Sequence, residues 1–201
     1  MMGSGFDLKD IADYYSKKTD SEIIYIATEN ARGLRPGVLE IIEKEIIKRN
    51  LNPNILDGAK AQNKEYSLDE ITEIAHRIRS LPCPICGNRT AKLNGTVMHT
   101  VKSFILFSTF RKEQIIACPD CLDKKNQESI FSTALLGWWG FPSGFLRTPF
   151  YIYNNIKSKK QNRISEPNET LLGFTMQHIG EIETYKKDVE KLERIIKYVK
   201  K

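Results

Sequence analysis

The sequence predicts an α+β fold in which helices flank a central pair of strands. Apolar residues recur at helical spacing in residues 7–50 and again in residues 166–201. Residues 96–117 are instead rich in Val, Ile, Phe and Thr, which is typical of strands. Residues 130–156 are almost uncharged, which indicates a buried or otherwise covered segment. The chain of 201 residues suffices for one domain or two small ones.

The first predicted element is an N-terminal helical unit over residues 7–50. Residues 7–17 carry one apolar face, Thr19 offers an N-cap for a second helix, and Pro36 suits the first turn of a third. A DNA-reading helix-turn-helix is the alternative, but these residues lack a strong basic cluster. We therefore expect this unit to serve in packing or docking.

Residues 51–66 are predicted to be a linker, because they contain Asn-Pro-Asn and Asp-Gly turn signals. Ser67 then suits the N-cap of another helix, with Glu70 at the capping-box position. This helix leads directly into the cysteines. We expect residues 67–128 to combine the helix with the structure that the cysteines form.

All four cysteines lie in two Cys-x-x-Cys pairs, Cys83 with Cys86 and Cys118 with Cys121. Each such turn presents two thiolates to one metal ion, and two turns complete the tetrahedral site that zinc prefers. A proline stiffens each turn, and Gly87 suits a position of positive φ. Four thiolates leave no open coordination position, so the spacing predicts a structural Zn²⁺ ion.

The insert between the pairs favours a zinc ribbon. Asn94-Gly95 is a turn signal, after which residues 96–117 predict two antiparallel strands. The alternatives are two disulfides or four buried free thiols. Residues 1–20 lack the apolar core of a secretory signal, so we expect a cytoplasmic chain with reduced cysteines. His76 and His99 are expected to be surface or packing residues, because the cysteines already fill the site.

The nearly uncharged run over residues 130–156 holds both tryptophans and a single charged residue, Arg147. A ribbon of the form CPxCG…CPxC followed by Gly-Trp-Trp-Gly-Phe-Pro resembles a group of uncharacterised bacterial zinc-ribbon proteins. Residues 83–156 carry this resemblance. It implies a ribbon followed by an apolar segment and brings no established activity.

Three interpretations of this apolar aromatic hairpin, placed at residues 129–156, stay open. It is a core element of two short helices, a re-entrant or interfacial membrane hairpin, or a protein-interaction surface. The residues predicted to contact a membrane or partner are Trp138, Trp139, Phe141, Phe145, Phe150 and Tyr151. The basic residues predicted to flank the segment are Lys124, Lys125, Lys157, Lys159, Lys160 and Arg163. C-terminal helices are predicted over residues 166–201, with Asn168 as the first N-cap and residues 184–201 as one amphipathic helix.

The net charge of +6 favours an anionic partner, either nucleic acid or an anionic lipid surface. The sequence shows no phosphate-binding loop and no recognisable catalytic constellation, which makes an enzyme the least favoured class. We therefore expect a non-enzymatic zinc-binding adaptor that acts through its aromatic hairpin on a protein partner or at the inner membrane surface. The alternative is a zinc-ribbon nucleic-acid-binding protein. The sequence predicts no oligomeric state.

Overall fold

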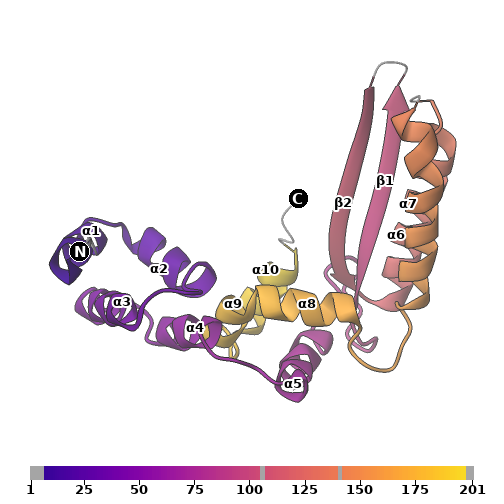
Figure 1. Cartoon of the computed structure of the whole chain (residues 1–201). Helices are drawn as coiled ribbons and strands as arrows, with labels where there is room; N and C mark the ends of the chain where they lie inside the picture. Colours follow the sequence, from indigo (N-terminus) through magenta and orange to yellow (C-terminus); the bar gives the residue numbers. More distant parts are fainter. Residues whose placement is uncertain (1–6, 105–106, 140–141, 198–201) are drawn as a thin grey trace. The chain divides into compact units, whose positions relative to one another are not determined.

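The computed structural model describes residues 7–104, 107–139 and 142–197. This part of the chain forms ten helices and one two-stranded antiparallel sheet (Figure 1), which confirms the mixed helix-and-strand class. The chain divides into two compact units. One unit comprises Met1–Tyr66 and His178–Val189, and the other comprises Ser67–Gln177 and Glu190–Lys201.

The first unit is helical. Its helices are α1 (Leu8–Ser16), α2 (Asp20–Glu29), α3 (Pro36–Lys48), α4 (Asn54–Gln62) and α9 (Ile179–Thr184). Thr19 begins α2 with a complete capping box to Glu22, and Pro36 occupies the first turn of α3, as predicted. The core is apolar and includes Ile23 and Ile42, neither of which is exposed to solvent.

The predicted linker over residues 51–66 instead contains helix α4. The pair Asp57-Gly58 predicts a turn, but Gly58 lies within α4, beside the backbone of Gly180 in α9. Gln62, at the end of α4, donates to the carbonyl of Ala27 and accepts from the N–H of Ala31, at 2.8 and 2.9 Å. The glycine therefore permits a close helix–helix approach, and α4 belongs to the helical unit.

The second unit contains the sheet. Its elements are α5 (Leu68–Arg79), β1 (Asn94–Phe104), β2 (Phe107–Ala117), α6 (Pro119–Leu136), α7 (Ser143–Lys160), α8 (Glu169–Gln177) and α10 (Val189–Lys197). Ser67 and Glu70 form the predicted capping box of α5. Asn168 accepts a hydrogen bond from the N–H of Leu171 at 3.0 Å, as expected for the N-cap of α8. The last predicted helix is shorter than expected, because α9 ends at Thr184 and α10 begins only at Val189.

Strands β1 and β2 pair in register from Asn94 with Ala117 to Phe104 with Phe107. Asn94-Gly95 is therefore not a turn but the start of β1, which corrects the prediction. The cause is a tertiary contact: the side chain of Asn168 accepts from the N–H of Gly95 and donates to its carbonyl, at 3.2 and 2.6 Å. A Cβ on Gly95 would meet the backbone nitrogen of Leu171 at 2.8 Å, so the glycine allows α8 to approach the strand.

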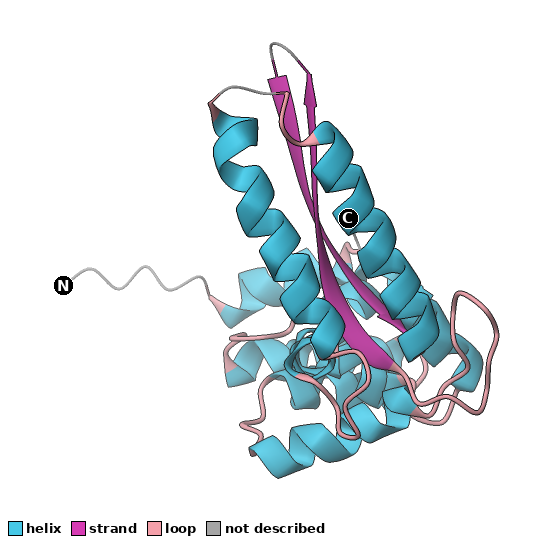
Figure 2. Ribbon diagram, turned by 90° about the vertical axis from the view of Figure 1, so that its right-hand side faces the viewer, coloured by secondary structure: helices cyan, strands magenta, loops and turns pink. Residues whose placement is uncertain are grey.

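Helices α6 and α7 form an antiparallel pair along β1 (Figure 2). They are longer than the predicted hairpin at residues 129–156, because α6 begins at Pro119, immediately after a metal-binding candidate, Cys118. The charged residues 123–128, between the cysteines and the predicted hairpin, are thus helical. The end of β1 lies beside the end of α6, because Ser103 Oγ in β1 donates to the carbonyl of Gly137 at 3.0 Å.

Candidate functional site

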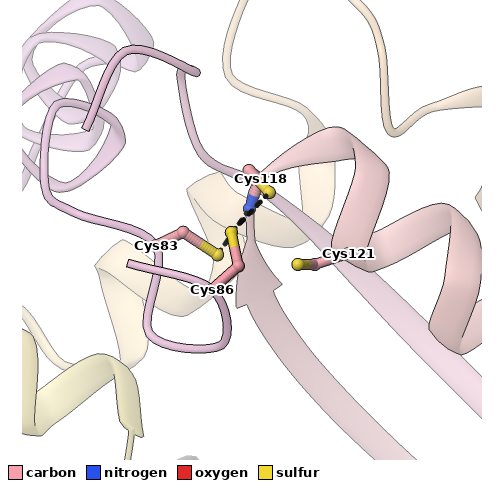
Figure 3. Close-up of side chains that lie close together, drawn as sticks. All are labelled: Cys83, Cys86, Cys118 and Cys121. Carbon is pink, nitrogen blue, oxygen red and sulfur yellow. Dashed lines mark hydrogen bonds between the residues drawn. The ribbon is translucent and has the colours of Figure 1, made fainter. Parts of the chain in front are cut away.

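The four cysteine side chains converge on one point (Figure 3). Their sulfur atoms all lie within 4.8 Å of one another, and Cys86 Sγ is 3.6 Å from Cys118 Sγ. A tetrahedral zinc site with Zn–S distances of about 2.3 Å places its sulfurs roughly 3.8 Å apart. All four cysteines are free thiols, so the disulfide alternative does not hold in this structure. The cluster could bind one metal ion.

The first pair lies in a tight turn after α5. Gly87 N–H donates to the carbonyl of Cys83, and Cys83 N–H donates to the carbonyl of Asn88, both at 2.8 Å. Gly87 has a φ of 73°, in the left-handed region that favours glycine. The predicted role of this glycine is confirmed. The turn leaves Cys83 buried and Cys86 exposed.

The second pair is built into the start of α6. Cys118 is the N-cap residue, Pro119 follows in the first turn, and Cys121 lies in that same turn. The N-terminus of a helix carries a partial positive charge, which favours thiolates there. A metal held by both pairs would join the loop after α5 to the junction of β2 and α6.

Burial and hydrogen bonding act on these thiols in opposite directions. Burial raises the pKa of the Cys83 thiol, but N–H groups of Cys118, Cys86 and Ile85 point at its sulfur and bring the pKa down to about 7. Burial raises the pKa of Cys118, and it raises that of Cys121 together with the neighbouring thiols of Cys118 and Cys86. Four thiolates this close repel one another, and a bound divalent cation would stabilise all of them. The donor set therefore fits a thiolate-binding metal ion.

The two histidines considered at the sequence level lie apart from the sulfur atoms. His76 is exposed and lies 3.3 Å from a carboxylate oxygen of Glu166. His99, in β1, packs edge-on against Tyr151 with ring centroids 5.2 Å apart. Neither belongs to the group of potential metal ligands found in the described residues.

The aromatic residues of the apolar segment divide into two groups. Trp138 and Trp139 are 42% and 69% exposed, and Phe145 and Phe150 are also exposed. The interpretation of the segment as a simple core element therefore fails for these four side chains. Tyr151 is half-buried, and its ring packs against His99 and Phe110 of the sheet. Phe141 lies outside the described residues.

Further exposed apolar residues on α6 and α7 were missed at the sequence level. These are Phe131, Leu135, Leu146, Tyr153 and Ile156. Helical spacing could have found those of α7, because Leu146 and Tyr153 are seven residues apart and thus share one face. We call these five residues, together with Trp138, Trp139, Phe145 and Phe150, the outer face; within it Trp138, just after α6, and Phe145 of α7 are in contact, with ring centroids 5.8 Å apart.

The predicted basic residues lie at the end of the hairpin away from its tip. Lys125 pairs with Glu128 at 3.0 Å, and Arg163 pairs with both Asp120 and Asp123 at 2.7 and 2.8 Å. The remaining four belong to α6 or to the last turn of α7; they are Lys124, Lys157, Lys159 and Lys160. Three of these, Lys124, Lys157 and Lys160, are exposed.

Within the described ranges, no helix combines the length and apolar character needed to cross a membrane. No protein-family model matches the chain, and no curated protein and no solved structure matches it either.

Proposed function

We propose that the protein is a non-enzymatic adaptor in which a structural zinc ion anchors a helical hairpin whose outer face contacts a partner. The observation that carries the proposal is the position of the cysteines. They lie at the base of α6, and the exposed aromatic residues lie at its other end and on α7. Soft thiolate ligands in a tetrahedral arrangement favour zinc over harder cations.

The metal would position the outer face by fixing the junction of β2 and α6. Ala117 ends β2 and Pro119 begins α6, so a metal bound at Cys118 and Cys121 holds the point at which strand and helix meet. Fixing this junction limits the directions in which α6 can leave the sheet. A rigid hairpin presents its aromatic side chains with little loss of conformational entropy when a partner binds.

Exposed aromatic residues at this density are unusual for a surface that faces only water. Single exposed apolar residues are common, but a contiguous group marks an interaction site. Tryptophan in particular is enriched among the residues that dominate binding energies. The outer face thus supplies the contact surface of the adaptor.

Two measurements on the full chain test this function. Metal analysis of purified protein should find about one zinc ion per chain, and the double substitution Cys83→Ser with Cys86→Ser should abolish it. Size and fractionation analysis without detergent should find the wild type in larger complexes or with membranes. Phe131→Gln with Leu135→Gln should shift the protein to the monomer while it keeps its metal, because both side chains are exposed.

Three results would count against the proposal. The absence of bound zinc removes the anchor. Loss of folding in the Phe131→Gln, Leu135→Gln variant makes the outer face a core element. Binding to DNA or RNA that falls steeply with salt and survives this substitution favours the nucleic-acid function instead.

A further inference from the structure

The contact between the helical hairpin and the sheet is polar. Asn155 in α7 donates to the carbonyl of His99 at 2.7 Å and accepts from its N–H at 2.8 Å. Thr133 in α6 accepts from the N–H of Val101 at 3.2 Å, and Ser129 donates to the His99 carbonyl at 2.9 Å. These side chains satisfy the backbone groups of β1 that point away from β2. Asparagine, serine and threonine therefore occupy the positions where a water-soluble helix normally buries leucine.

Small residues complete this inward face. Gly144 lies so close to β1 that a Cβ on it would meet Ser103 Oγ at 2.5 Å. Thr133, Thr148 and Asn155 are fully buried between the elements. Small residues at the contact, with side-chain hydrogen bonds across it, are the packing mode of helices in a bilayer, where apolar burial between helices provides no driving force.

The outward side of the same helices is apolar. On α7 the most exposed side chains include Leu146 at 71% and Tyr153 at 64%, and on α6 Phe131 reaches 70%. The hairpin therefore has its polar side chains inside and its apolar side chains outside. The polar side chains inside are explained by the backbone groups of β1, which need hydrogen-bond partners. The apolar side chains outside are not explained in this way, since charged residues on the outward side would leave those hydrogen bonds unchanged.

The outer face is also free of charge over most of its length. Between Glu128 and Lys157 the only charged residue is Arg147. Its guanidinium lies 4.6 Å from the ring centroid of Phe110 in β2, so it is directed towards the sheet. The indole N–H groups of Trp138 and Trp139 donate to backbone carbonyls one turn earlier in the chain. These exposed indoles thus have hydrogen-bond partners without water.

The character of this face changes along the hairpin axis. Phe150 and Lys157 are seven residues apart on α7, as are Tyr153 and Lys160, so each lysine continues the face of an aromatic residue. Along α6 and α7 the end near the tip is apolar and the far end is basic, whereas the exposed Lys102 near the tip belongs to β1. A protein interface surrounds an apolar centre with a polar rim. A gradient along one axis instead matches the passage from acyl chains to anionic headgroups.

We propose that the partner of the outer face is an anionic lipid bilayer, into which the hairpin inserts with its tip first and without crossing it. This inference rests on the proposed function and names its partner. The 14 residues from Ser143 to Ile156 rise about 21 Å as a helix, less than the roughly 30 Å of bilayer hydrocarbon. Lys157 and Lys160 then lie at the headgroups.

The test uses the metal-loaded full chain and two kinds of vesicle, pure phosphatidylcholine and its mixture with phosphatidylglycerol. The chain has only two tryptophans, and both lie at the tip, so fluorescence reports on the tip alone. Mixed vesicles should shift the emission to the blue, lipids with brominated acyl chains should quench it, and the protein should float with the vesicles. Pure phosphatidylcholine should bind more weakly.

Matched variants separate the contributions. Leu146→Glu with Phe150→Glu should lower vesicle partitioning by roughly a hundred-fold or more. Ile47→Glu with Leu68→Glu, which alters two exposed apolar residues outside the hairpin, should leave partitioning unchanged. Lys157→Gln and Lys160→Gln should each weaken binding to the mixed vesicles by roughly five-fold, with little effect on pure phosphatidylcholine.

Emission that mixed vesicles do not change overturns the proposal. So does emission that is already blue-shifted without lipid in a dimer, since a second copy then covers the outer face. Suppose that the protein does not bind vesicles, while Phe131→Gln with Leu135→Gln still releases it from larger complexes. The bilayer proposal is then wrong, and the adaptor function stands. If that variant changes neither vesicle binding nor complex size, the adaptor function fails as well.

Discussion

The first unit and the α6–α7 hairpin distribute polarity in opposite ways. Helices α1 to α4 bury isoleucine and alanine, with Ile23, Ile42 and Ala27 completely inside. Apart from Leu122 next to the second cysteine pair, the side chains that helices α6 and α7 bury are asparagine, serine and threonine, while large apolar side chains are exposed. The first arrangement is what water imposes on a helical unit. In the second arrangement, polar side chains of the helices bind backbone groups of a strand, and the apolar side chains of the same helices are exposed.

Of the changes predicted here, metal removal should have the largest effect, and it should affect the two regions differently. A structural zinc ion in a small domain supplies about 10–16 kcal/mol of binding free energy at neutral pH. We expect a strong chelator to abolish hydrogen-exchange protection in residues 83–121, while α1 to α4 keep theirs because their core contains no metal ligand. Mass-spectrometric hydrogen exchange measures both regions in one sample. Unchanged protection at the cysteines would show that the fold does not need a metal.

Two isoleucine truncations compare how much a buried and an exposed apolar side chain contribute to the free energy of unfolding. Ile42 in α3 is fully buried, so Ile42→Ala should lower the free energy of unfolding by about 2–5 kcal/mol. Ile156 in α7 is 44% exposed, so Ile156→Ala should change it by only about 0.5 kcal/mol in the absence of lipid. Denaturant titration of each variant gives the two values. Equal losses would mean that the outer face is covered within the monomer.

A smaller effect on stability is expected at the hydrogen bonds between Asn155 and His99, and the adjacent Asn154 provides a control. Asn155→Leu has similar volume but leaves the N–H of His99 without its side-chain acceptor and removes one of the donors to the His99 carbonyl, which should cost about 1–3 kcal/mol of unfolding free energy. Asn154→Leu changes the adjacent residue, which is half-exposed, and should have little effect. The same denaturant titration compares the two. A stabilised Asn155→Leu variant would show that the contact tolerates apolar packing.

Local features of this chain could be predicted from the sequence because their partners lie within a few residues. The capping boxes at Thr19 and Ser67 each join residues three apart, and the turn at Gly87 closes back on Cys83, four residues earlier. The two cysteine pairs are far apart in the sequence, but each Cys-x-x-Cys turn is a complete local unit, so the thiolate cluster could also be predicted. Composition likewise predicts that residues 130–156 are buried or otherwise covered.

The tertiary structure decided which side of each element is covered. Gly58 and Gly95 carry turn signals, yet each lies in a regular element because a distant segment packs against it. Tyr151 and Phe150 are adjacent and equally apolar, but one faces His99 and the other faces outwards. The direction of α7 is set by Asn155, whose partner His99 is 56 residues earlier in the chain. Sequence patterns register periodicity along one helix, whereas the medium or strand that a face meets depends on contacts that form only when the chain has folded.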